Sequence, residues 1–207
     1  VDTENTFDLT EKEHSLLMTE IKSIINNEKI DGIILQDYNK GVLTENIIKE
    51  VVAIANEKNI PVGVDPKKKN FLSYKNVTLF KPNLKELREG LGITVKDESI
   101  DDITNAIDLL HKELNCKYIM TTLSERGVLI KDYDTNTCHH IPAHLRKIAD
   151  VSGAGDTVLS VAMLCLVCKQ EAYNIAALSN LAGGLVCEEL GAVSINKERL
   201  FAESKKI

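Results

Sequence analysis

The amino-acid sequence predicts an α/β protein, built as three layers around a mostly parallel sheet. Short apolar runs alternate along the chain with longer segments whose apolar residues recur at helical spacing. Such a strand and helix alternation is typical of a parallel sheet covered by helices on both faces. Nearer the C-terminus two short strands flank a polar turn, which predicts an antiparallel edge.

The first part of the chain alternates helix and strand four times. Helices are expected at residues 10–27, 45–58, 84–91 and 100–114, and strands at 32–35, 61–65, 77–80 and 118–122. Residues 128–130 and 137–141 then form the expected hairpin around a turn at 132–136. Two apolar helices follow at 154–169 and 172–190. We find no linker or internal repeat, and we expect a single domain over residues 1–207.

Composition and charge exclude several classes of protein. The 207 residues are 43% hydrophobic and 27% charged, which favours one globular core over a disordered chain. The net charge of -6 and a single basic block, Lys67 to Lys69, give no footprint for nucleic acid, so a small-molecule partner fits better. The apolar stretch 158–167 is too short to span a bilayer. We therefore expect no membrane segment. The five cysteines do not have the spacing of a disulfide framework, which predicts a reduced, cytoplasmic protein.

A glycine-rich turn, Asp150-Val151-Ser152-Gly153-Ala154-Gly155-Asp156-Thr157, leads directly into an apolar helix. Glycines at a helix N-terminus leave backbone N–H groups open to an anion, which the helix dipole also favours. Asp156 in the first turn is placed to act as a general base for a nearby hydroxyl. The alternative is that Asp156 only complements the helix dipole and that the glycines only make a loop.

Two further segments follow predicted strands, at the end where open parallel sheets bind ligands. Asn83 and Glu86 have the spacing of a capping box, which alone is enough to explain the pair. Thr122, Ser124 and Gly127 lie in a turn after the fourth strand, and without further context they are an ordinary turn. Asn180 lies on the last predicted helix, where a buried polar side chain is sufficient to explain it.

Taken together, these motifs resemble the PfkB, or ribokinase-like, family of carbohydrate kinases. The glycine-rich turn is similar to the family signature Asp-Thr-x-Gly-Ala-Gly-Asp, with Val151 in place of Thr. The resemblance implies that Gly153, Ala154 and Gly155 form an anion hole for the transferred phosphoryl group and that Asp156 is the base. It also implies ATP and Mg²⁺ as cofactors, with a monovalent cation as a further candidate. No P-loop motif is present in the sequence.

The resemblance also assigns the nucleotide and metal residues. Asn83 and Glu86 match the family's Asn-x-x-Glu motif, which organises magnesium and phosphate. Thr122 and Gly127 match its Thr-x-Gly-x-x-Gly loop for the nucleotide phosphates, with Ser124 in place of the first Gly. Asn180 matches the helix that borders the adenine pocket.

Four segments, at residues 35–41, 64–67, 81–83 and 122–125, are similar to the kinase domain of bacterial heptose-7-phosphate kinases, the first module of bifunctional ADP-heptose synthases. This subgroup implies a sugar-phosphate acceptor, with Asp37, Lys40, Asp65 and Lys67 near it, in the synthesis of lipopolysaccharide precursors. Three adjacent lysines are also typical of a solvated loop. Another PfkB sugar kinase, for ribose or fructose, and a non-catalytic nucleotide-binding scaffold stay open as alternatives.

The chain starts with Val1 rather than Met. In the family an N-terminal portion carries glycine-rich sugar-binding strands and a lid, and the resemblance begins after it. We therefore expect the chain to be the nucleotide-binding and catalytic portion, with a homodimer formed through the preceding portion.

Two further patterns resemble metal sites. Cys165 and Cys168 have zinc-like spacing but lie in an apolar helix, and His139 and His140 are adjacent on a strand, where neighbouring side chains point to opposite faces. Packing explains both, and we predict no metal site from them.

Overall fold

The computed structural model describes residues 6–94, 99–143 and 148–206. Its helices are α1 (Glu11–Asn27), α2 (Glu45–Glu57), α3 (Leu84–Leu91), α4 (Ile100–Leu114), α5 (Ala154–Val167), α6 (Ala172–Val186) and α7 (Lys197–Ser204). Its strands are β1 (Ile33–Gln36), β2 (Val62–Asp65), β3 (Leu79–Phe80), β4 (Tyr118–Thr122), β5 (Val128–Asp132) and β6 (Thr137–Ile141). Short 3₁₀ turns lie at Lys68–Asn70 and Ser124–Arg126.

The strands form one six-stranded sheet in chain order, from β1 to β6. The pairs from β1 to β4 are parallel, whereas β4, β5 and β6 pair antiparallel. The expected parallel sheet with an antiparallel edge hairpin is therefore confirmed. Because crossovers between parallel strands are right-handed, strands that follow chain order place their crossover helices on one face of the sheet. The opposite face is then left for the C-terminal helices.

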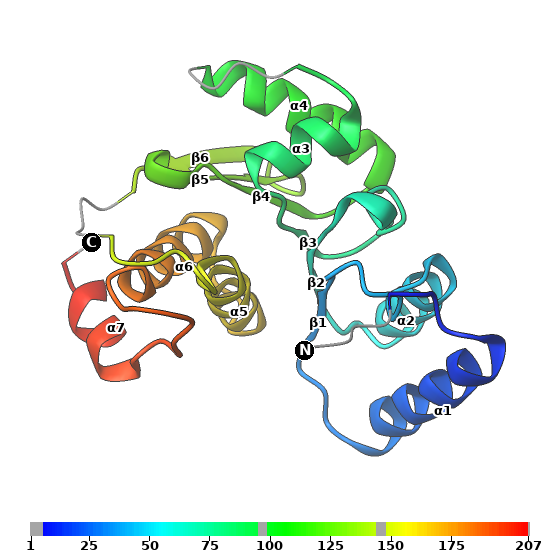
Figure 1. The fold of residues 1–207 in the computed structure, drawn as a ribbon. Coiled ribbons are helices and arrows are strands. Elements are labelled where there is room, and N and C mark those ends of the chain that lie inside the picture. The colour runs from blue at the N-terminus through cyan, green and yellow to red at the C-terminus, as the bar shows by residue number, and fades with distance from the viewer. Residues whose placement is uncertain (1–5, 95–98, 144–147, 207) are drawn as a thin grey trace.

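Figure 1 shows this division into three layers, with α3 and α4 above the sheet and α5 and α6 below it. The two faces carry separate hydrophobic clusters. In β4 the side chains alternate between them, because Ile119 joins the cluster under α2 to α4 while Tyr118 and Met120 join the cluster under α5 and α6. Both faces of the sheet are thus buried, which confirms the three-layer architecture.

Close packing of α5 on β2 depends on Gly63. A Cβ built at Gly63 would come within 2.3 Å of the sulfur of Met163 on α5, so a larger residue would displace that side chain or the helix. The N-terminal turn of α5 lies further along β2, where a Cβ built at Gly155 would be 3.7 Å from Asp65 Oδ2 at the end of the strand. No described helix is both long and apolar enough to cross a membrane.

Several elements differ from the sequence-based expectation: α6 ends at Val186 rather than at residue 190, and β5 extends to Asp132 rather than ending at residue 130. The third strand is only Leu79–Phe80, although the apolar pattern predicted residues 77–80; Val77 is buried but does not pair. Helix α7 was not predicted; none of its residues is fully buried, although Leu200 packs against the cluster under α5 and α6.

Candidate active site

The C-terminal ends of the parallel strands meet at one edge of the sheet. Gln36 is opposite Asp65 in the register of β1 and β2, and Asn83 forms an isolated bridge with Thr122 beyond the ends of β3 and β4. A pocket of about 820 Å³ opens at this edge. Of the residues expected at the site, those that line the pocket are Asp65, Lys67, Asn83, Glu86, Thr122, Ser124, Gly127, Ala154, Gly155 and Asn180.

The glycine-rich turn opens onto this pocket as the N-terminus of α5. Gly153 is the N-cap at φ 75°, in the left-handed region, and no side chain caps the helix there. The N–H of Ala154 donates to Val151 O and that of Thr157 to Gly153 O. Among the described residues, the N–H groups of Gly155 and Asp156 have no acceptor outside the helix. Two amides at a positive helix end are therefore available to an anion.

The side chain of Asp150 holds this turn in place. Its Oδ1 accepts hydrogen bonds from Ser152 N at 2.9 Å and Ser152 Oγ at 2.8 Å, and its Oδ2 accepts one from Gly191 N at 3.1 Å. These bonds lower the pKa of Asp150 below its ordinary value, with the backbone bond from Ser152 as the largest cause. The glycine-rich turn is thus tied to the segment that follows α6.

A buried ion pair lies against the turn. Lys81 Nζ is 3.1 Å from Asp65 Oδ1, and both side chains are almost fully buried. Gln36 Nε2 donates to the other oxygen of Asp65 at 2.8 Å. A Cβ built at Gly155 would be 3.7 Å from both Lys81 Nζ and Asp65 Oδ2, so the pair is in contact distance of the glycine. The ammonium of Lys81 therefore lies beside the first turn of α5.

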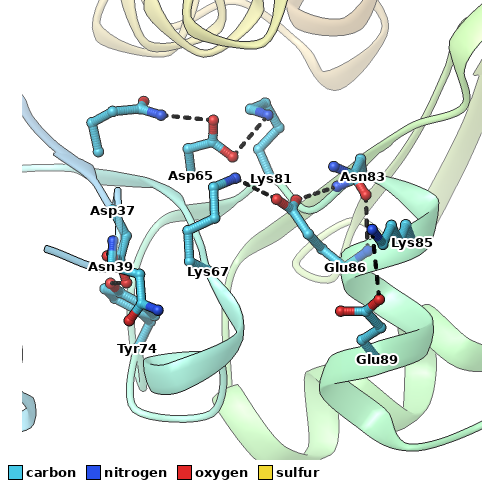
Figure 2. A network of polar contacts seen from close by, with 11 residues as sticks. Asp37, Asn39, Asp65, Lys67, Tyr74, Lys81, Asn83, Lys85, Glu86 and Glu89 are labelled. Atoms are coloured by element: carbon cyan, nitrogen blue, oxygen red, sulfur yellow. Dashed lines mark hydrogen bonds and ion pairs between the residues drawn. The ribbon is translucent and has the colours of Figure 1, made fainter.

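A second ion pair faces the pocket (Figure 2). Lys67 Nζ donates to Glu86 Oε1 at 2.5 Å, and Glu86 Oε2 accepts from Asn83 N at 2.9 Å. The Asn83 side chain accepts from Glu86 N at 2.8 Å, which completes a capping box at the start of α3. Partial burial lowers the pKa of Lys67, but the hydrogen bond and charge of Glu86 outweigh it, so the net shift is upward. We call Asp65, Lys67, Lys81 and Glu86 the strand-end cluster.

The turn after β4 forms the opposite wall. Ser124 and Gly127 both have positive φ, and a Cβ at Gly127 would lie 2.0 Å from Ile141 O, so the turn requires glycine there. Nη2 of Arg126 lines this wall and, within the described part of the chain, is buried without a hydrogen-bond partner. Asn180 Nδ2 donates to Pro142 O at 2.9 Å and so fixes the loop after β6.

The expected base, Asp156, is exposed on the other side of the N-terminal turn of α5. Its Oδ2 accepts a hydrogen bond from Tyr38 Oη at 3.2 Å. Asp37, by contrast, is only 2% exposed, and its carboxylate accepts from Tyr74 Oη at 2.7 Å and from Asn39 N at 2.6 Å. Asp37, Lys40, Gly153 and Asp156 do not line the 820 Å³ pocket.

Sequence reasoning missed four residues of this region: Gln36, Tyr38, Lys81 and Arg126. A signal for Lys81 was present, because a lysine directly after a buried strand needs a buried partner, and Asp65 ends the neighbouring strand. Nothing in the sequence indicated which side chain would meet Asp156. The residues with metal-like spacing are separated: Cys165 is buried and Cys168 exposed, while His139 packs on Tyr173 and His140 bonds to Arg126 O.

Solved structures with this fold are ribokinase-like kinases. The crystal structure of phosphofructokinase-2 from Escherichia coli in complex with potassium superposes with a TM-score of 0.81 at 18% identity, over 94% of this chain and 62% of that one. Arabidopsis thaliana ribokinase, complexed with ribose and ATP, superposes with a TM-score of 0.72 at 18% identity, over 97% of this chain and 60% of that one. At these identities the likeness shows the fold.

The sequence itself matches a family of sugar-phosphorylating enzymes. Residues 3–199 match the pfkB family of carbohydrate kinases, and the chain belongs to that family. The Bifunctional protein HldE of Syntrophotalea carbinolica is 36% identical over 173 residues, covering 84% of this chain and 35% of the relative. That of Aliarcobacter butzleri is 33% identical over 200 residues, covering 97% of this chain and 40% of the relative. The chain thus spans 35% to 40% of the length of these relatives.

Proposed function

We propose that this carbohydrate kinase transfers the γ-phosphoryl group of ATP to heptose 7-phosphate, giving heptose 1,7-bisphosphate in the cytoplasm. The observation that carries the proposal is the meeting of three groups at one sheet edge: two available amides of α5, the buried cation Lys81, and the exposed carboxylate of Asp156. Amides and a cation stabilise charge on a phosphoryl group, and the carboxylate takes a proton from the acceptor.

The 820 Å³ pocket is large enough for a nucleotide. Its walls offer donors where phosphates need them, since Arg126 Nη2 has no partner in the described residues and the amides of Gly155 and Asp156 point outward from the helix end. Asn180, which borders the pocket on α6, holds the loop at Pro142.

Glu86 suits a magnesium ion that is shared with the nucleotide. Its carboxylate lines the pocket and is oriented by Asn83, and one oxygen is bound by an ammonium that a cation can replace. Magnesium is usually held by one or two carboxylates, substrate phosphates and waters, so a single glutamate is sufficient. When bound, the ion neutralises charge on the nucleotide phosphates.

The transfer itself follows from the positions of Asp156 and the α5 amides. Asp156 accepts the proton of the acceptor hydroxyl as the acceptor oxygen bonds to the γ-phosphorus, and the bond from that phosphorus to the bridging oxygen of ADP breaks. The amides of Gly155 and Asp156 and the ammonium of Lys81 stabilise the charge on the phosphoryl oxygens. ADP leaves with the bond electrons.

A phosphorylated acceptor is supported by Lys67. Its side chain is 38% exposed and lines the pocket, so it is the more accessible of the two cations in the strand-end cluster. The segments that resemble heptose-7-phosphate kinases meet at this same sheet edge, and relatives at 33% to 36% identity are named HldE. Both observations favour heptose 7-phosphate over an unphosphorylated sugar.

The test is a phosphoryl-transfer assay on the protein in its full natural length, with ATP and magnesium. Heptose 7-phosphate, fructose 6-phosphate, ribose and fructose are compared by kcat/KM, and the product is identified by NMR. We expect heptose 7-phosphate to give the highest value. A preference for ribose or fructose contradicts the acceptor assignment, and nucleotide binding without transfer to any sugar would favour the scaffold alternative.

A further inference from the structure

Tyr38 lies at the tip of the loop after β1, and that loop is held by its own buried bonds. The Asp37 carboxylate accepts from Asn39 N at 2.6 Å and from Tyr74 Oη at 2.7 Å (Figure 2). Asn39 and Gly41 both have positive φ, and Gly41 O accepts from Leu9 N at 3.1 Å. The side chain next to Asp37 therefore projects from a fixed backbone.

From this loop the Tyr38 hydroxyl reaches the catalytic helix. Its Oη donates to Asp156 Oδ2 at 3.2 Å, between residues 118 positions apart in the chain. The Tyr38 side chain is 58% exposed, so its ring is accessible to a ligand. The charge of Asp156 is the largest cause that raises the pKa of the Tyr38 phenol, and the charges of Asp65 and Lys67 also act on it. Tyr38 thus lies among the groups expected to surround the acceptor.

The bond leaves one oxygen of the base available. Among the described residues, Oδ2 of Asp156 has Tyr38 as its side-chain partner and Oδ1 has none. A carboxylate held through one oxygen has a defined rotamer, and its other oxygen then points in a fixed direction. General-base catalysis depends on this geometry, because the base must lie within hydrogen-bond distance of the proton it removes.

We propose that Tyr38 is a positioning residue of the acceptor site: its hydroxyl holds Asp156 through Oδ2 so that Oδ1 faces the acceptor hydroxyl, and its exposed ring forms one wall of the sugar site. This inference rests on the proposed function, since it needs a sugar acceptor. The competing interpretation is that the contact between Tyr38 and Asp156 is an incidental surface contact. Such a contact stabilises the protein little, because both groups are exposed to solvent.

The test is Tyr38→Phe in the protein in its full natural length, which removes the hydroxyl and keeps the ring. We expect kcat to fall about 3- to 10-fold, the range for loss of one hydrogen bond, with KM for ATP and for the acceptor within about 2-fold. Tyr38→Leu, which also removes the ring, should in addition raise KM for the acceptor. Tyr133→Phe is the matched control, because Tyr133 Oη donates to another carboxylate, Asp108, at 2.8 Å and lies outside the pocket.

Three outcomes overturn the inference: an unchanged kcat in Tyr38→Phe, an equal loss in Tyr133→Phe, or an equal loss of acceptor-independent ATP hydrolysis. A second readout needs no activity. With ¹³C-labelled tyrosine, NMR titration should show a lower phenol pKa for Tyr38 in Asp156→Asn than in the wild type, and an unchanged value contradicts the contact. If the wild type phosphorylates no sugar, the proposed function fails; if it does and Tyr38→Phe matches it, only the role of Tyr38 fails.

Discussion

Two clusters that pair lysine with carboxylate side chains occupy different parts of this protein. The strand-end cluster lies at the C-terminal edge of the parallel sheet. The other, which we call the hairpin cluster, comprises Asp108, His111, Lys131 and Tyr133 between α4 and the β5–β6 hairpin. Lys131 Nζ and Tyr133 Oη both donate to Asp108 Oδ1, at 2.6 Å and 2.8 Å. Both clusters therefore contain a lysine ammonium paired with a carboxylate.

Their surroundings differ. In the hairpin cluster the ring of His111 stacks on Tyr133 at 3.5 Å, which fills the space beside the polar groups. The strand-end cluster borders an 820 Å³ pocket and the available amides of α5. The contrast teaches that paired charges alone do not indicate a site. A site also needs open space and donors without partners, and here the end of a parallel sheet supplies both.

The largest expected difference between the regions is catalytic. Asp156→Asn should lower kcat by about 10² or more while ATP affinity changes only a few-fold, because the amide cannot accept the hydroxyl proton. Asp108→Asn makes the same change in the hairpin cluster and should leave kcat unaltered. Steady-state kinetics on both variants makes the comparison, and a similar kcat in the two would remove Asp156 from its role as base.

The next effect is on stability. Lys81→Met leaves Asp65 buried without its ion-pair partner and should lower the free energy of unfolding by about 3 to 5 kcal/mol. Lys131→Met breaks a pair whose carboxylate is 39% exposed, and we expect a loss of about 1 kcal/mol or less. Urea denaturation measures both. The double variant Asp65→Leu with Lys81→Met should recover much of the loss, and an equally unstable double variant would argue against an unpaired charge as the cause.

A third effect separates two neighbouring lysines. Lys67→Met should raise KM for the sugar phosphate about 10- to 150-fold, the value of one charge-assisted hydrogen bond, and raise KM for ATP much less. Lys69, paired with Asp8 at 2.5 Å outside the pocket, supplies the control Lys69→Met, which should change neither KM. Equal KM values for the sugar phosphate in the two variants would assign the lysines to a solvated loop.

The smallest effect is a pH dependence of the hairpin cluster. Burial raises the pKa of Asp108, but the hydrogen bonds from Lys131 and Tyr133 outweigh it and the net shift is downward. A lowered folded-state pKa stabilises the protein above the unfolded pKa, and this contribution is lost as pH falls through the folded value. In Asp108→Asn the free energy of unfolding should therefore fall less steeply below about pH 4 than in the wild type. The difference between the two proteins in this loss should be less than about 1 kcal/mol. If the free energy of unfolding fell equally steeply with pH in the variant and the wild type, this prediction would be contradicted.

The sequence predicted the parts of this structure that depend on local pattern. The strand and helix alternation specified the layers, and the glycine-rich turn before α5 became an uncapped helix N-terminus at the sheet edge. Asn83 and Glu86 form the capping box that spacing predicted. The same glutamate still faces the pocket, so the structural and the functional interpretation apply to one residue at once.

Other features could not be predicted because they depend on how distant segments meet. Tyr38 and Asp156 are brought together by β1 and α5, and no spacing rule relates residues 118 positions apart. Asp37, adjacent to Tyr38, was expected near the acceptor, and its carboxylate is instead used inside the loop; its role in acceptor binding stays a prediction. The sequence identified the right loop, whereas the direction of each side chain depends on tertiary packing.

The chain-order arrangement of the strands has a consequence for biosynthesis. The sheet and the helices on one of its faces are complete by residue 141, but Leu79, Met120 and Ile130 on the other face stay uncovered until α5 and α6 have been made. A nascent chain that pauses there would expose an apolar surface, the kind of surface that promotes aggregation and chaperone binding. Since Asp156 is on the helix that covers this surface, the step that protects the chain from aggregation also brings the proposed base to the sheet edge.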